Sequence, residues 1–114
     1  QGQLTAQLKV AKAQQEEASL SFQQSLLDAG VEINNALSAC QTSISKGNSL
    51  ENQIKSLEHA VRNTQLLMQH SNTTYLEVLT AQQSLLSAKL AQIENDFIEA
   101  QNIILLYRAL GGGA

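Results

Sequence analysis

Apolar positions in the C-terminal part of the chain recur at alternating steps of three and four residues. The series runs Leu76, Leu79, Gln83, Leu86, Leu90, Ile93, Phe97, Ala100, Ile104, Tyr107, with one polar member. This heptad spacing is typical of a helix that packs lengthwise against another helix. A second apolar stripe lies beside the first and comprises Val78, Ala81, Leu85, Ala88, Ile103, Leu106, Leu110. The two stripes predict a helix over about 76–109 that contacts more than one neighbour.

A heptad pattern also runs through the N-terminal part of the chain. Its members are Leu4, Leu8, Ala11, Gln15, Ala18, Phe22, Leu26, Ala29, Ile33, Leu37, Cys40, Ile44, followed by Leu50, Ile54, Leu57, Val61, Thr64, Met68. The phase slips at Gly47, and Gly47-Asn48 is also turn chemistry. We favour a continuous helix, because the pattern resumes at Leu50 and one interior glycine costs only about 1 kcal/mol. The first helix is therefore expected over about 4–70, a length of roughly 100 Å.

The stretch between the two helices combines weak helix formers with side chains that cap helices. It reads Ser71-Asn72-Thr73-Thr74-Tyr75, and Glu77 follows Thr74 at the spacing of a capping box. A turn over 71–75 would return the second helix alongside residues 37–70 of the first. The second helix should stop before the glycine-rich end, residues 110–114. The sequence thus predicts an all-α fold, a long antiparallel helical hairpin of the coiled-coil type.

The half of the first helix that precedes Leu37 has no partner within the chain. It nevertheless presents large apolar side chains, which are Leu4, Leu8, Phe22, Leu26, Ile33. Burying each of them is worth about 1.5–3 kcal/mol, so copies of the chain are expected to associate through this half. The chain also starts without Met, and we interpret it as a piece of a longer protein.

Composition excludes several classes of function. The absence of proline and the small number of glycines, 6, fit long helices and disfavour β-rich folds. The formal charge of −3 provides no basic surface for nucleic acid. One cysteine and two histidines are too few to close a Cys/His zinc site, and no cofactor is expected.

Candidate catalytic residues are few. His70, Ser71 and Glu77 lie near one another in sequence, but a triad needs groups fixed around an oxyanion hole, and an exposed turn does not fix them. His59 reads as an exposed histidine on a polar face, and Cys40 as a small buried thiol. We therefore expect no enzymatic activity. At the turn, exposure of Tyr75 and Leu76 is as compatible with a partner contact as with packing beneath the turn.

Two longer motifs point to a known family. Residues 75–86 read YLEVLTAQQSLL, and residues 106–113 read LYRALGGG. At this spacing they resemble the outer-membrane efflux factor family, the TolC-like channels of Gram-negative tripartite pumps. The similarity extends upstream through Gly2–Ala13 and Ala29–Leu37, with Glu32 at an acidic position of the family. The family usually has glycine in the tip turn where this chain has Ser71.

The resemblance implies a structure, a location and partners. The segment would be the second long periplasmic hairpin of an outer-membrane channel and part of an α-helical barrel. Three full-length chains would form the channel, which works with a periplasmic adaptor protein and an inner-membrane pump to export small molecules. The tip would dock the adaptor through Ser71, Asn72, Thr73, Thr74, Tyr75, Leu76, Glu77, Val78, Leu79. Polar, uncharged faces would suit a water-filled lumen.

A free-standing coiled-coil scaffold or adaptor is the alternative, since heptad periodicity alone would serve it equally well. The C-terminus separates the two interpretations. A scaffold does not need Leu110-Gly111-Gly112-Gly113 directly after an amphipathic helix, whereas the family continues there into its equatorial region.

Overall fold

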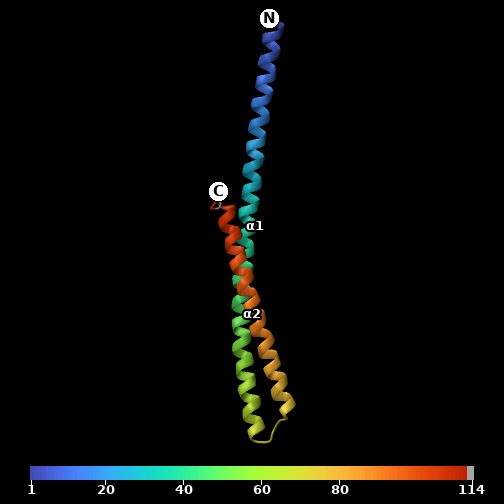
Figure 1. Cartoon of the computed structure of the whole chain (residues 1–114), viewed down its shortest axis with the longest axis vertical. Coiled ribbons are helices and arrows are strands. Elements are labelled where there is room, and N and C mark those ends of the chain that lie inside the picture. The colour runs from blue at the N-terminus through green and yellow to red at the C-terminus, as the bar shows by residue number, and fades with distance from the viewer. Residues whose placement is uncertain (113–114) are drawn as a thin grey trace. The chain divides into compact units, whose positions relative to one another are not determined.

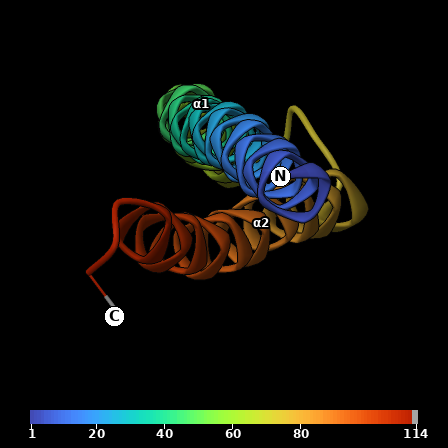
Figure 2. The ribbon, with the colours of Figure 1, turned by 90° about the horizontal axis from the view of Figure 1, so that it is seen from above.

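The computed structural model describes residues 1–112, which form two α-helices joined by a short turn. Helix α1 spans Gly2–Gln69 and helix α2 spans Tyr75–Ala109. The chain divides into two compact units, Gln1–Asn35 and Ala36–Ala114, and each is described by itself. In the second unit, α2 runs antiparallel beside the C-terminal half of α1 in both views of the ribbon (Figures 1 and 2). The predicted all-α helical hairpin is confirmed.

Helix α1 continues through Gly47 without a break. The alternative of a loop at Gly47-Asn48, which would have given a three-helix bundle, is therefore excluded. Gly47 lies in the seam that faces α2, and a Cβ atom at this position would lie 3.3 Å from the side-chain nitrogen of Asn95. The glycine thus makes room for a side chain of the opposite helix.

The side of α1 that faces α2 differs from the predicted seam at three positions. Leu37 and Met68, at the two ends of the paired stretch, are exposed, and the third difference lies at Ile44. Ser43 is buried, whereas Ile44 is exposed. With Ser43 in the seam, steps of three and four residues continue without a slip, so the expected phase slip at Gly47 is wrong. Apolarity alone had selected Ile44 over the neighbouring serine. The inner seam of α1 consists of Cys40, Ser43, Gly47, Leu50, Ile54, Leu57, Val61, Thr64.

The inner seam of α2 follows most of the second predicted stripe and is extended by polar residues. Two members of that stripe, Ile103 and Leu110, are exposed instead and were wrongly assigned to it. Val78 and Ala88 are buried, and Asn95 is the most buried residue of the helix at 2% exposure. The full seam is Val78, Ala81, Leu85, Ala88, Gln92, Asn95, Glu99, Asn102, Leu106, Ala109. The more hydrophobic series from Leu76 to Tyr107 is exposed throughout. Helix α2 therefore packs on α1 with its less hydrophobic face.

The end of α1 is closed by a Schellman motif. The Asn72 N–H donates to the Leu67 carbonyl at 2.8 Å, and the Ser71 N–H donates to the Met68 carbonyl at 3.0 Å. Ser71 has φ 60°, a left-handed conformation that favours glycine. This is the position at which glycine is usual in the family that the sequence resembles, so the backbone of the turn keeps the conformation that glycine would allow.

Both ends of α2 are also capped. Thr74 is the N-cap, and its hydroxyl accepts a hydrogen bond from the Glu77 N–H at 3.3 Å, as the capping-box spacing predicted. At the other end a second Schellman motif forms, with Gly111 at φ 89° and the Gly112 N–H donating to the Tyr107 carbonyl at 2.9 Å. Gly113 and Ala114 of the predicted glycine-rich end lie outside the described residues.

In the first unit, residues 2–35 belong entirely to α1. Every side chain of residues 1–35 is exposed except that of Ile33, which is half-buried. The exposed side chains include those of Leu4, Leu8, Phe22 and Leu26, which the sequence left without a partner. Within the described residues, neither helix contains a stretch long and apolar enough to cross a bilayer.

Candidate partner-binding surfaces

The nine residues predicted at the tip differ in their accessibility. Val78 is only 3% exposed because it packs into the inner seam, so its side chain does not face a partner. Thr73 is half-buried. The other seven are exposed, namely Ser71, Asn72, Thr74, Tyr75, Leu76, Glu77, Leu79. Of the nine residues expected to dock the adaptor, Val78 therefore has no side chain available for that contact.

Large apolar side chains are exposed on both sides of the turn. Leu76 is 70% exposed and Tyr75 65%. The last turns of α1 contribute Leu66 and Leu67, which are also exposed, and a shallow groove runs over Asn63, Leu66, Leu67, His70. Sequence reasoning had not selected this pair, although two adjacent leucines beside the seam were a usable signal. The tip thus offers apolar surface from both helices.

The Thr73 side chain is the least satisfied polar group of the tip. Its hydroxyl oxygen is buried and has no hydrogen-bond partner in the described part of the chain. A buried hydroxyl without a partner costs about 1–3 kcal/mol. The N-cap role falls to the neighbouring Thr74, so Thr73 is not needed for capping.

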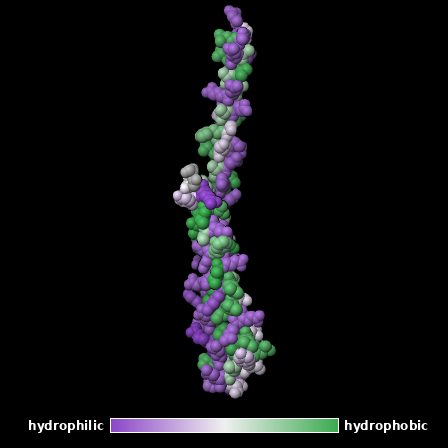
Figure 3. Space-filling model, viewed as in Figure 1, coloured by the Kyte–Doolittle hydropathy of each residue, from purple (hydrophilic) through white to green (hydrophobic). Residues whose placement is uncertain are grey.

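The exposed series on α2 forms a second surface, here called the apolar stripe. It consists of Leu76, Leu79, Gln83, Leu86, Leu90, Ile93, Phe97, Ala100, Ile104, Tyr107. Apolar side chains are visible on the surface along this part of the molecule (Figure 3). Contiguous apolar surface of this kind marks sites of contact with other protein. The stripe starts at the tip and follows α2 to its last turn.

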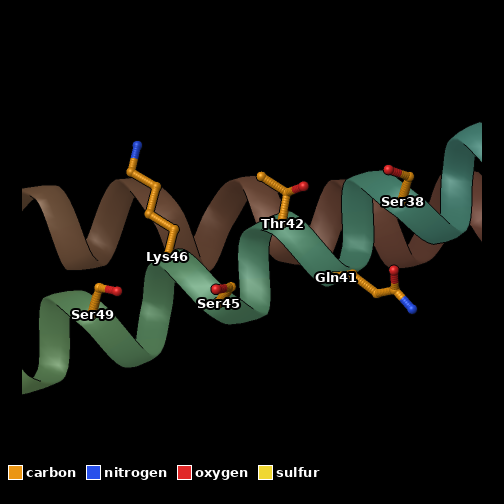
Figure 4. Close-up of a pocket in the computed structure, with 6 residues that line it drawn as sticks. All are labelled: Ser38, Gln41, Thr42, Ser45, Lys46 and Ser49. Atoms are coloured by element: carbon orange, nitrogen blue, oxygen red, sulfur yellow. The ribbon is translucent and has the colours of Figure 1, made fainter.

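The side of α1 that points away from α2 is polar. Its exposed residues repeat at steps of four and three, and we call them the polar stripe: Ser38, Thr42, Ser45, Ser49, Asn52, Ser56, His59, Asn63. A shallow groove follows its first part, lined by Ser38, Gln41, Thr42, Ser45, Lys46, Ser49. Figure 4 shows these six side chains on α1, with α2 passing behind. Hydroxyl and amide groups dominate this face, so it is suited to water.

The groups with chemical reactivity are not assembled into a site. Among residues 1–112, no three His, Cys, Asp or Glu side chains lie close enough to hold a metal ion. His59 is exposed, and its Nδ1 atom lies 3.2 Å from a side-chain nitrogen of Arg62. Cys40 is buried in the inner seam, as expected from the heptad pattern. His70 is exposed beside the turn.

The model of the outer membrane efflux protein family matches residues 1–112. The chain belongs to this family. The resemblance noted in the two motifs is thereby confirmed, and with it the expected origin in an outer-membrane protein of a Gram-negative bacterium. The free-standing scaffold loses its support.

Three curated relatives show how far the similarity reaches. The cation efflux system protein CusC of Escherichia coli K12 is 30% identical over 112 residues, which are 98% of this chain and 24% of CusC. The pyoverdine export outer membrane protein OpmQ of Pseudomonas putida is also 30% identical, with the same coverage. The probable outer membrane lipoprotein SilC of Salmonella typhimurium is 25% identical over 112 residues, again 98% of this chain and 24% of SilC. The chain thus spans about a quarter of the length of these relatives. No solved structure matches the chain significantly.

Proposed function

We propose that this hairpin is a wall segment of the periplasmic tunnel of an outer-membrane efflux channel and that its tip docks a periplasmic adaptor protein. The observation that carries the proposal is the apolar stripe of α2, which stays exposed while α2 packs on α1 with its other face. A helix with two packing faces is what a closed wall of helices requires, because each helix needs a neighbour on both sides. Family membership supports the same role.

In this proposal, the apolar stripe packs against the hairpin of a neighbouring copy in a homotrimer. Polar side chains occupy the inner seam of the hairpin, but the apolar stripe has only one, Gln83. Its burial between hairpins would remove from water large apolar side chains that the hairpin alone leaves exposed. The polar stripe of α1 would line the water-filled passage. The segment has no catalytic part in transport, and an inner-membrane pump supplies the energy.

At the tip, Tyr75 and Leu76 would provide the centre of the adaptor contact, with Leu66 and Leu67 beside them. All four are exposed. They flank the turn, whose residues cap the end of α1 and the start of α2. Tyrosine is among the residue types that most often dominate the binding energy of an interface, and the exposed leucines beside it add apolar contact surface. Sequence similarity does not indicate which small molecule is exported. CusC and OpmQ share the same percentage of identical residues with this chain, and their names refer to different exported substances.

The test is the substitution Leu76→Glu in the full-length channel protein. A carboxylate buried in a small contact has no partner that would offset its desolvation, so we expect efflux to be lost. The hairpin should still fold, since Leu76 is 70% exposed. Drug or metal susceptibility in a strain that lacks the native channel reports efflux, and the amount of assembled trimer in the membrane reports folding.

Two further variants separate docking from assembly. Val61→Glu places a charge in the inner seam, where Val61 is buried, and should reduce the amount of trimer as well as efflux. Gln82→Ala removes an exposed amide of α2 outside the tip and should preserve both. Normal efflux by the Leu76→Glu protein, with normal amounts of trimer, would remove the tip from the mechanism.

A further inference from the structure

A layer of polar side chains crosses the inner seam of the hairpin. The side-chain nitrogen of Asn95 donates to the Ser43 carbonyl at 2.9 Å. That of Asn102 donates to the Ser43 hydroxyl at 2.6 Å and to the Ala39 carbonyl at 3.2 Å. The Ser43 hydroxyl itself donates to the Ala39 carbonyl at 3.0 Å. Two amides of α2 are thus anchored on one stretch of α1.

The surface of α1 is shaped to receive these amides. Ala39, Ser43 and Gly47 follow one another at intervals of four residues, so small side chains form one ridge of the helix. Small residues at a helix contact allow the two backbones to approach closely. At Gly47 the missing Cβ would stand 3.3 Å from the Asn95 nitrogen. Asn95 consequently fits against this ridge and is almost completely buried.

Hydrophobicity alone does not explain this arrangement. Ile93 and Phe97 flank Asn95 in sequence and belong to the apolar stripe, yet both are exposed while Asn95 is buried. Burial of apolar surface is the dominant favourable term in helix packing, so a rotated α2 with the apolar stripe against α1 is a serious competitor. In the rotated arrangement, the side-chain amides of Asn95 and Asn102 would lose their hydrogen bonds to Ala39 and Ser43.

We propose that Ser43, Gly47, Asn95 and Asn102, the polar layer, select the rotation and register of α2 on α1 and thereby keep the apolar stripe on the outside. A buried asparagine in a coiled coil fixes register at a cost in stability, because its hydrogen bonds form in only one alignment. The inference stands on contacts within the hairpin. Its consequence, a stripe that is free for a neighbouring hairpin, rests on the proposed function.

The register makes the proposal testable by cross-linking. One heptad from the Gly47–Asn95 contact toward the tip, Ile54 lies level with Ala88, and both are buried. Leu90 lies two residues further along and belongs to the exposed stripe. The pair Ile54→Cys with Ala88→Cys therefore reports the observed rotation, and Ile54→Cys with Leu90→Cys reports the rotated one. Cys40 is replaced by alanine in both.

The experiment treats the purified full-length protein with a short thiol cross-linker and measures linked peptides by mass spectrometry. Links within one chain are separated from links between chains on a non-reducing gel. With the polar layer intact, the link from 54 to 88 should dominate. With Asn95→Ala and Asn102→Ala, the ratio of the 54–88 link to the 54–90 link should fall about tenfold, because both amides lose their bonds to α1. The matched control, Gln82→Ala with Gln101→Ala, removes two exposed amides and should leave the ratio unchanged.

A second variant covers the case in which the alanine protein does not fold. Asn95→Leu with Asn102→Leu replaces the amides of the layer with apolar side chains. Either face of α2 can then pack on α1, so both the 54–88 and the 54–90 link should form. An unchanged ratio in the leucine protein, or an equal fall in the glutamine control, would overturn the proposal. Because the readout is a link inside one hairpin, it does not depend on efflux or on adaptor docking, and the two proposals can fail separately.

Discussion

Asn95 and Phe97 stand two residues apart on α2 and face opposite sides, and the polar one is buried. Asn95 is 2% exposed and Phe97 64%. The usual partition of polar and apolar residues is reversed at this level of the hairpin. The reversal has a local cause in the hydrogen bond from Asn95 to Ser43, and it leaves Phe97 for a contact outside the hairpin.

Phe97→Asp should therefore affect assembly and not hairpin folding. The carboxylate would remain hydrated in an isolated chain but would lose its water between packed hairpins, at a cost of several kcal/mol. We expect a strong decrease in assembled trimer, measured in membranes of cells that express the full-length protein. Gln101→Asp, on an exposed polar position of the same helix, is the control and should assemble normally. Normal assembly of the Phe97→Asp protein would show that the stripe is not a subunit contact.

A substitution in the turn should stabilise the hairpin. Ser71 holds a left-handed conformation, φ 60°, which costs a residue with a Cβ atom about 1–2 kcal/mol. Ser71→Gly removes this strain, and the greater chain entropy of unfolded glycine offsets part of the gain. We expect a net gain of about 0.5–1 kcal/mol, visible as a higher midpoint of thermal unfolding by circular dichroism. Asn72→Gly relieves no positive φ and should lower the midpoint. A lower midpoint for Ser71→Gly would mean that the serine side chain makes a contact of its own.

The two glycines inside α1 should respond differently to alanine. At Gly30 a Cβ would meet nothing within 4 Å, so Gly30→Ala should gain the helix propensity of alanine, about 0.8–1 kcal/mol. At Gly47 the new methyl would press on Asn95, and the gain should be cancelled or reversed. Thermal unfolding of both variants under identical conditions gives the comparison. Equal stabilisation by the two substitutions would contradict the close fit at Gly47.

Sequence periodicity predicted most of the fold but did not decide which of the two stripes of α2 packs on α1. The continuity of α1, the turn and the Thr74 cap followed from spacing and local chemistry, which depend on near neighbours. The face of α2 that packs on α1 did not follow from the spacing. A heptad pattern is recognised by its apolar members, and the inner seam of α2 contains the polar residues Asn95 and Asn102. Ser43 was passed over in favour of Ile44 for the same reason. The hydrogen bonds that satisfy these buried polar residues join positions 52 to 63 residues apart. A pattern of neighbouring residues does not reveal such contacts.

The candidate surfaces were predictable to a similar extent. Tyr75 and Leu76 were selected by their place in the turn, and the structure leaves both exposed. Val78 was included because it is near them in sequence, yet the helical repeat turns it into the inner seam. Leu66 and Leu67 were missed because they lie outside the heptad seam and before the turn. Accessibility at a helix end depends on how the partner helix leaves the turn, which the spacing of apolar residues does not reveal.

One face of α1 should line the passage through the channel. Away from α2, α1 has a mostly uncharged side, the polar stripe with Lys46 beside it, and a charged side with an ion pair of 3.7 Å between Lys55 and Glu51. Charged side chains in a channel retain or exclude solutes according to their charge, whereas hydroxyls and amides exchange hydrogen bonds freely with water. A channel for export is better served by the uncharged side. Ser45 is exposed in the middle of the groove shown in Figure 4 and is the best position for a probe.

Ser45→Cys and Lys55→Cys, both with Cys40→Ala, place single thiols on the two sides of α1. Each full-length protein is reconstituted in a planar bilayer and treated with a bulky thiol reagent while its conductance is recorded. A bulky group at position 45 should narrow the passage and reduce conductance, whereas the same group at position 55 should leave it nearly unchanged. Mass spectrometry of the recovered protein establishes that both thiols are modified. A decrease at 55 and none at 45, with both modified, would assign the passage to the charged side and the polar stripe to the outer surface of the tunnel.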